Sequence, residues 1–254
     1  MITPDLIIAF LTLTFLEVVL GIDNIIFISI LSSRFPIEQR KKLMQIGLFL
    51  AMIMRVLLLM GVNWLTKMQN TWFYFDTEYF SSNISIQTLI LLTGGLFLIY
   101  KSTREIFDKV EVDLGNETLE GKSTFSFSRA LFQIVLIDIV FSFDSILTAV
   151  GMTNGVPYAL FIMIAAVVIA ISIMIGFADP VSQFVNKHPS LQILGLSFLL
   201  LIGFMLITEA ASLSETVIFG SSISTIPKGY LYFAILFSLG VEMLNMRIKK
   251  AKRN

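Results

Sequence analysis

The chain has 254 residues, of which 56% are hydrophobic and only 14% are charged. Soluble globular domains are about 45–50% apolar and about 25% charged, so this composition indicates a protein that lies within a membrane. The formal net charge of zero argues against a nucleic-acid partner, and the lack of cysteine excludes disulfides and thiolate metal sites.

Seven apolar segments are long enough to cross the hydrocarbon core, which takes roughly 20 residues of helix. They are residues 5–31, 43–65, 86–106, 129–151, 156–178, 190–210 and 229–247. We therefore predict an all-α transmembrane fold of about seven helices, in a single membrane domain over residues 1–254. The lipid bilayer is the expected surrounding, and the expected location is the plasma membrane, crossed several times.

Basic residues are distributed unevenly between the connecting segments. If the N-terminus lies outside, the inner segments contain every lysine and arginine except Lys67, Lys228 and Arg55. Cytoplasmic segments carry this excess in membrane proteins, so we predict an N-out, C-in orientation. The outer segment 66–85 contains the aromatic run TWFYF and is expected to lie at the membrane interface, whereas the polar inner loop 107–128 is expected to be a flexible connector.

Two pairs of spans resemble each other. FLEVVLGIDNIIF (15–27) aligns without a gap with LIDIVFSFDSILT (136–148), and GLFLIYK (95–101) aligns with GFMLITE (203–209). Because each half holds three spans, the second copy is inverted relative to the first, as in many secondary transporters. We predict one repeat over residues 5–106, a second over 129–210, and a C-terminal helix at 229–247 outside both.

Glu17, Asp23, Asp138 and Asp144 all lie well inside the first and fourth predicted spans. Insertion of each acid at a helix centre costs about 2.5–3.5 kcal/mol, so the four together cost on the order of 10 kcal/mol. They must face the bundle interior and be neutralised by protons, a basic residue or a cation. Arg55 is the only basic residue deep in a span and could pair with one carboxylate but not with all four, so a bound cation fits best.

The spacing of these motifs leaves two interpretations open. Glu17, Gly21 and Asn24 follow an i, i+4, i+7 spacing that places them on one helix face, and Asp138, Ser142 and Ser145 do the same. The second acid of each motif points about 120° away from the first on an ideal helix. Either the helices unwind near Gly21 and Ser142, or each acid faces a different side of a wide polar cavity.

The oxygen donors in these motifs are hard ligands, which suit Mn²⁺, Mg²⁺ and Ca²⁺. We predict a metal site formed by Glu17, Asp23, Asn24, Asp138, Asp144 and Ser145. Secondary or gating residues are Arg55, Glu209, Glu242 and Asn245. Glu209 fits either an outer vestibule or the interface, and Glu242 either pairs with Arg55 or lies at the inner interface. His188, beside Pro189, is expected to be a loop or interface residue and not a ligand.

The sequence resembles the TerC family of membrane proteins, which is named for tellurium resistance and is related to the LysE transporter superfamily. The resemblance rests on EVVLGIDN (17–24), DIVFSFDS (138–145) and IPKGYLYFAILFSLGVEMLN (226–245), and it covers essentially the whole chain. It implies Mn²⁺ efflux or Mn²⁺ supply to secreted enzymes, as for bacterial members of the Alx and YkoY type. The family's motif acids correspond to the four acids named above, with Asn24 and Ser145 following them.

The leading hypothesis is a membrane transporter that exports divalent cations, Mn²⁺ first, through a midplane acidic site. The chain has no Walker A motif, so protons or the membrane potential would supply the energy for alternating access. The alternative is a metal-binding membrane scaffold of a resistance or secretion-metalation complex. An enzyme is not expected, because HExxH is absent, and an amino-acid exporter fits the paired acids less well. A homo-oligomer and a secretion-machinery partner are both compatible with these hypotheses.

Overall fold

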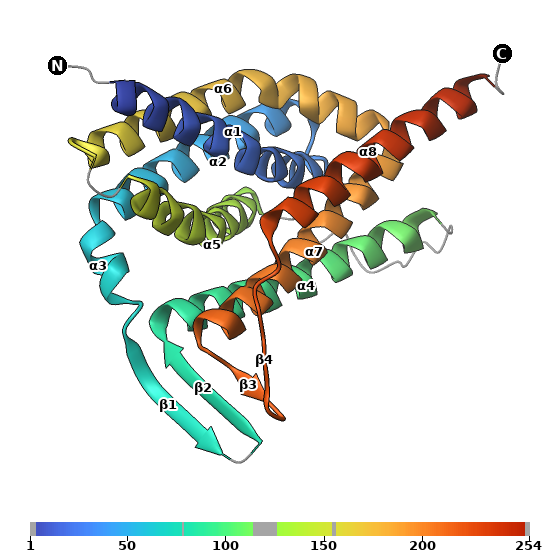
Figure 1. Cartoon of the computed structure of the whole chain (residues 1–254). Coiled ribbons are helices and arrows are strands. Elements are labelled where there is room, and N and C mark those ends of the chain that lie inside the picture. The colour runs from blue at the N-terminus through green and yellow to red at the C-terminus, as the bar shows by residue number, and fades with distance from the viewer. Residues whose placement is uncertain (1–3, 78, 114–125, 154–155, 252–254) are drawn as a thin grey trace. The chain divides into compact units, whose positions relative to one another are not determined.

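The computed structural model describes residues 4–77, 79–113, 126–153 and 156–251 (Figure 1). The helices are α1 (Pro4–Ser32), α2 (Ile37–Met60), α3 (Val62–Lys67), α4 (Ile86–Asp113), α5 (Phe127–Met152), α6 (Ala159–Lys187), α7 (Pro189–Leu213) and α8 (Lys228–Ala251). The strands are β1 (Thr71–Thr77), β2 (Phe80–Ser85), β3 (Val217–Ile218) and β4 (Ser221–Ser222). Within the described residues, seven helices are long and apolar enough to cross a membrane, which confirms the predicted all-α transmembrane fold.

Several helix boundaries differ from the predicted spans. The second span begins at Ile37 and ends at Met60, where Gly61 separates α2 from the short α3. The third and fifth spans were predicted to end at residues 106 and 178, but α4 continues to Asp113 and α6 to Lys187. Hydropathy falls towards the ends of these two helices, where polar and charged residues follow the apolar run, but polarity by itself does not end a helix. The predicted loop around His188 is thereby reduced to that residue, since α7 begins at Pro189.

Neither α1 nor α5 is interrupted at the two motifs. Both helices run continuously through Gly21 and Ser142, so the interpretation in which they unwind there is wrong. The Ser145 hydroxyl donates to the carbonyl oxygen of Ser142 at 3.3 Å, a local bond that serine commonly makes inside a regular helix. The site must therefore be built from side chains that project from intact helices.

Contacts divide the chain into two compact units, each of which takes helices from both halves of the sequence. The first unit comprises Met1–Asn70 and Glu120–Asn186, with α1, α2, α3, α5 and α6. The second comprises Thr71–Leu119 and Lys187–Asn254, with α4, α7, α8 and the four strands. The spans that aligned in the sequence thus occur in the same unit, α1 with α5 and α4 with α7.

In the first unit, α2 packs along α5, and α1 contacts both. Their shared core is formed by Leu43, Met44, Leu48, Ile134 and Ile137, all of which are almost fully buried. Gly21 brings α1 against α6, because a Cβ atom there would lie 2.3 Å from Sδ of Met174. The motif glycine therefore serves close helix packing.

Gly21→Ala should change the free energy of unfolding by about 1 kcal/mol or less, because the gain in helix propensity offsets a rearrangement of Met174. The atoms nearest to the added methyl group are Sδ and Cε, the far end of a flexible side chain. Thermal unfolding in detergent measures the change. A loss of several kcal/mol would show that Met174 has no alternative rotamer.

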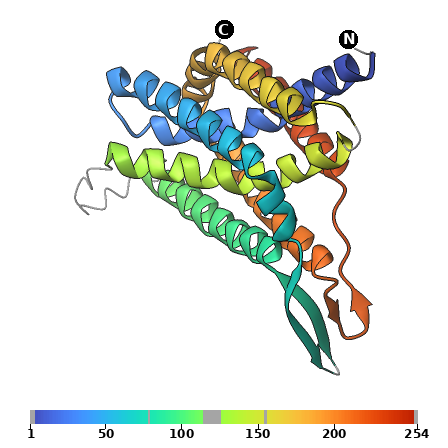
Figure 2. The same cartoon turned by 90° about the vertical axis from the view of Figure 1, so that its left-hand side faces the viewer.

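In the second unit, α4 and α7 lie side by side and antiparallel (Figures 1 and 2). They touch backbone to backbone: a Cβ atom on Gly95 would lie 2.6 Å from the carbonyl oxygen of Gly203, and one on Gly203 would lie 2.9 Å from that of Gly95. Ile207 and Ile99 flank the two glycines in the same reciprocal way. Such small residues let membrane helices approach closely. These positions are also matched in the sequence alignment, although the inverted repeat itself stays a prediction.

The strands form one antiparallel sheet in the order β1-β2-β3-β4. Phe80 pairs with Ile218 and Ser81 with Val217, so the sheet joins the segment after α3 to the segment after α7. Both segments must then lie on the same side of the membrane, as the predicted alternation of spans requires. The strands were not predicted, because the sequence analysis treated residues 66–85 only as an interfacial excursion.

Candidate functional site

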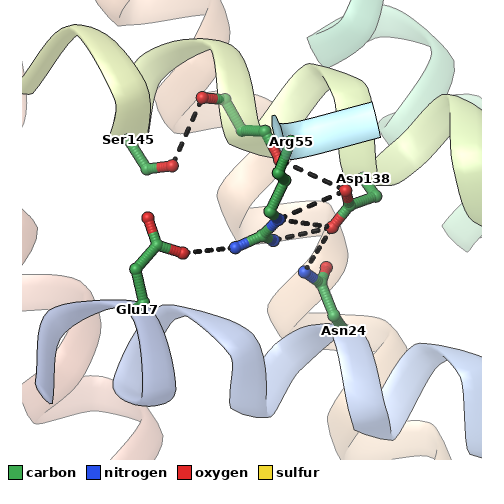
Figure 3. A network of polar contacts seen from close by, with 6 residues as sticks. Glu17, Asn24, Arg55, Asp138 and Ser145 are labelled. Carbon is green, nitrogen blue, oxygen red and sulfur yellow. Dashed lines mark hydrogen bonds and ion pairs between the residues drawn. The ribbon is translucent and has the colours of Figure 1, made fainter. Parts of the chain in front are cut away.

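A buried ion-pair network connects three helices of the first unit (Figure 3). Arg55 of α2 lies between Glu17 of α1 and Asp138 of α5. Its Nη2 atom donates to Oδ1 of Asp138 at 2.6 Å, Nε lies 3.1 Å from the same oxygen, and Nη1 donates to Oε2 of Glu17. A guanidinium group has five N–H donors in a rigid plane, which is why one arginine can bridge two carboxylates.

The network is shielded from the surroundings of the unit. The exposed fractions of Glu17, Arg55 and Asp138 are 6%, 3% and 4%. Asp138 is held by two further donors: the amide nitrogen of Asn24 lies 3.1 Å from Oδ1, and the Ser142 hydroxyl lies 3.2 Å from Oδ2. Several hydrogen bonds to one buried carboxylate stabilise its charged form.

Helical spacing explains how these side chains meet. Glu17 and Asn24 are seven residues apart on α1 and both face α5, while Asp138 and Ser142 are four residues apart on α5. Figure 3 shows Ser145 on the same side of α5, above the carboxylate of Glu17. The structure thus brings four of the six predicted metal-site residues into one cluster: Glu17, Asn24, Asp138 and Ser145.

Asp23 and Asp144, the other two predicted ligands, have side chains that lie outside the described part of the structure. Among the described side chains, no group of three or more His, Asp and Glu is spaced to hold a metal ion. Arg55 joins the two described carboxylates of this cluster, whereas the sequence indicated that it could pair with one carboxylate but not with all four. With both carboxylates ionised, the described network retains one uncompensated negative charge.

The predicted secondary residues are divided between the units. All three guanidinium nitrogens of Arg55 bond to Glu17 and Asp138. Glu242 belongs to the second unit, and its two predicted alternatives, a pairing with Arg55 or a place at the inner interface, stay predictions. Glu209 is half-buried in α7, and Asn245 is exposed on α8. Glu242 lines a pocket of about 310 Å³ between α7 and α8, together with hydroxyl groups of Ser190, Ser197 and Ser238.

Sequence reasoning missed a second charged cluster, in α4. Lys101 forms an ion pair of 2.8 Å with Glu105, which is 3% exposed, and Lys109 donates a hydrogen bond to Gln192 of α7. These residues had been assigned to the end of a span and an inner loop. Their i, i+4, i+8 spacing was the available signal, because it places all three charged groups on one helix face.

In the part of the chain that the structure describes, seven helices able to span a membrane and a buried arginine–carboxylate network define a polytopic integral membrane protein with charged groups in its interior. The chain matches the model of the integral membrane protein TerC family over residues 2–254, and it belongs to that family. The resemblance found in the sequence is thereby confirmed.

Among known proteins, the chain is 46% identical over 245 residues to the UPF0053 inner membrane protein YgdQ of Escherichia coli K12, which covers 96% of this chain and 93% of YgdQ. It is 44% identical over 247 residues to a UPF0053 protein of Haemophilus influenzae, with 97% and 96% coverage. UPF0053 protein YegH of Escherichia coli K12 is 44% identical over 242 residues, but the match spans 42% of YegH. No solved structure matches. With the seven spans, these relatives make the chain a multi-pass protein of the plasma membrane, as predicted.

Proposed function

We propose that the protein is a secondary transporter that exports divalent metal cations, with Mn²⁺ as the first candidate substrate. The observation that carries the proposal is the charge imbalance in the first unit, where one guanidinium faces two buried carboxylates. A net charge inside a membrane protein is costly unless a counter-ion or a proton accompanies it. Asp23 lies on α1 with Glu17, and Asp144 lies on α5 with Asp138. Two further acids on these helices increase the negative charge that a bound cation would neutralise.

The arginine gives the site a way to release its ion. In the described network, Arg55 holds Glu17 and Asp138 together. A cation that enters competes with the guanidinium for the same oxygens, and its departure lets the ion pair form again. Arg55 thus acts as an internal substitute for the substrate, which keeps the empty carrier from being left with bare buried carboxylates.

The donor chemistry supports a hard divalent ion. Carboxylate, amide and hydroxyl oxygens suit Mn²⁺, Mg²⁺ and Ca²⁺, and the chain has no thiol that would favour a softer metal. The resemblance to manganese-exporting members of the family selects Mn²⁺ from this group. Protons or the membrane potential drive the cycle in this proposal.

The test is Mn²⁺ flux in proteoliposomes, with a pH gradient and a membrane potential applied in each direction and with Mg²⁺ and Ca²⁺ as competitors. Wild type should give saturable flux. In Asp23→Asn and Asp144→Asn, flux should fall by about tenfold or more, because each change removes a proposed carboxylate ligand and even outer-shell changes at metal sites cost about 10–100-fold in affinity. Asp76→Asn is the matched control, because this exposed acid lies in β1, outside the spanning helices, and should leave flux unchanged.

The other outcomes separate the alternatives. Absence of flux under every gradient, together with Mn²⁺ binding that both substitutions abolish, would point to a metal-binding scaffold. Flux that survives both substitutions would place the transport site away from the aligned motifs. Saturable flux of Mg²⁺ or Ca²⁺ but not of Mn²⁺ would support a cation transporter and show that its substrate is not Mn²⁺.

A further inference from the structure

The four-stranded sheet of the second unit has one apolar face. Residues directly opposite each other in an antiparallel pair project to the same side of the sheet. The register pairs Phe73 with Ile84, Phe75 with Ser82, Thr77 with Phe80, and Phe80 with Ile218. The large apolar side chains on this side, called here the apolar face, are Phe73, Phe75, Phe80, Ile84 and Ile218.

The opposite side of the sheet is polar. Tyr74 pairs with Asn83, and Asp76 pairs with Ser81. The Asn83 amide also donates a hydrogen bond of 2.9 Å to the carboxylate of Glu215. Among the described residues of this region, the carboxylates therefore lie with the polar side, and the apolar face carries no charged side chain. The sheet is amphipathic.

Among the described residues, most of the apolar face is exposed. Phe73 and Phe75 are 54% and 52% exposed, and Phe80 and Ile218 are 41% and 39% exposed. Contiguous exposed apolar surface of this kind marks contact with a membrane or with another protein.

The attachment of the sheet identifies the membrane as the partner. β2 ends at Ser85 and the spanning helix α4 begins at the next residue, Ile86. β3 begins at Val217, shortly after α7 ends at Leu213, and Figure 1 shows the strands extending from the ends of these two helices. Residues next to the ends of spanning helices are expected at the level of the lipid headgroups. Trp72 and Tyr79, which are also exposed, belong to the residue types enriched at that level.

We propose that the sheet lies on the surface of the leaflet that contains the N-terminal end of α4, with the apolar face in the headgroup and acyl-chain boundary and the polar side in water. The partner is the lipid bilayer itself. In this arrangement the apolar side chains of the sheet contact lipid and its charged side chains contact water. It also holds the α4–α7 pair at a defined depth in the membrane. It does not depend on the proposed transport function.

Spin labelling tests this placement, because the chain has no native cysteine and each introduced one is labelled alone. Phe75→Cys and Asp76→Cys are neighbours in an exposed strand but project to opposite sides of the sheet. The full chain in proteoliposomes would be labelled with a nitroxide, and its accessibility to lipid-soluble oxygen and to a water-soluble nickel chelate would be compared. We expect the ratio of oxygen to nickel accessibility to be several-fold higher for the Phe75→Cys label.

A second variant, Phe73→Cys, repeats the measurement on the apolar face if the first does not fold, and it should resemble Phe75→Cys. Labels on both sides that prefer the nickel chelate would place the sheet in water and overturn the proposal. Labels on the apolar face that are shielded from both reagents would also overturn it. In that case, dipolar broadening between labels would identify a second copy of the chain as the partner.

Discussion

Arg55→Ala is expected to lower the free energy of unfolding by about 3–5 kcal/mol, because it removes the cation from a buried charge network. The carboxylates of Glu17 and Asp138 would then be left close together without a guanidinium between them. Both lie in spanning helices, where no water replaces the lost partner. Thermal unfolding of the purified protein in detergent, followed by loss of the monodisperse species, measures the effect.

Two comparisons make the Arg55 result specific. Arg55→Met combined with Glu17→Gln and Asp138→Asn should recover most of the lost stability, because no charge is then left unpaired. Lys41→Ala breaks an ion pair of 3.0 Å with Asp179 whose side chains are 63% and 35% exposed, so it should cost less than about 1 kcal/mol. If Arg55→Ala unfolds like the wild type, the two carboxylates do not require a cation, and the charge argument for transport loses its basis.

Gly95→Ala is expected to destabilise the protein by about 1–3 kcal/mol, because the added methyl group has no space. Its Cβ atom would lie 2.6 Å from the carbonyl oxygen of Gly203 and 2.8 Å from Cγ1 of Ile207. A backbone oxygen cannot rotate away as a methionine side chain can, so α4 and α7 would have to separate along the contact. Thermal unfolding in detergent again measures the loss.

Gly240→Ala is the matched control, since Gly240 also lies inside a spanning helix of the same unit but has no atom within 4 Å of an added Cβ. It should be neutral or stabilising by up to about 1 kcal/mol. Gly203→Ala should resemble Gly95→Ala, because the contact is reciprocal. If Gly95→Ala and Gly240→Ala behave alike, the close crossing of α4 and α7 does not contribute to stability.

The features that local sequence determines were predictable. Hydropathy locates the seven spans. Acids within apolar segments, such as Glu17 and Asp138, are predicted to face the bundle interior, because exposing a charge to lipid would be too costly. The face shared by Glu17 and Asn24 follows from helix periodicity alone. These arguments require no knowledge of which helices are neighbours.

Features that depend on contacts between distant segments were not predictable. Arg55 and Asp138 are 83 residues apart, and nothing local indicates that α2 lies where one guanidinium reaches both α1 and α5. The pairing of β2 with the two-residue β3 likewise joins segments too short to show a strand pattern. Glu105 lies at the very end of the third predicted span, where a charged residue is ordinarily exposed at the membrane surface, so its burial was not apparent from the sequence.

The mixing of both halves of the sequence in each unit has a consequence for how the protein is made. A ribosome delivers α1, α2 and α4 first, and these carry Glu17, Arg55 and Gly95. Asp138, which pairs with Arg55, is made only with α5, and Gly203, which packs against Gly95, is made only with α7. In an unfinished chain, Arg55 therefore has Glu17 but not Asp138 as a partner, and Gly95 lacks the backbone of Gly203 that packs against it.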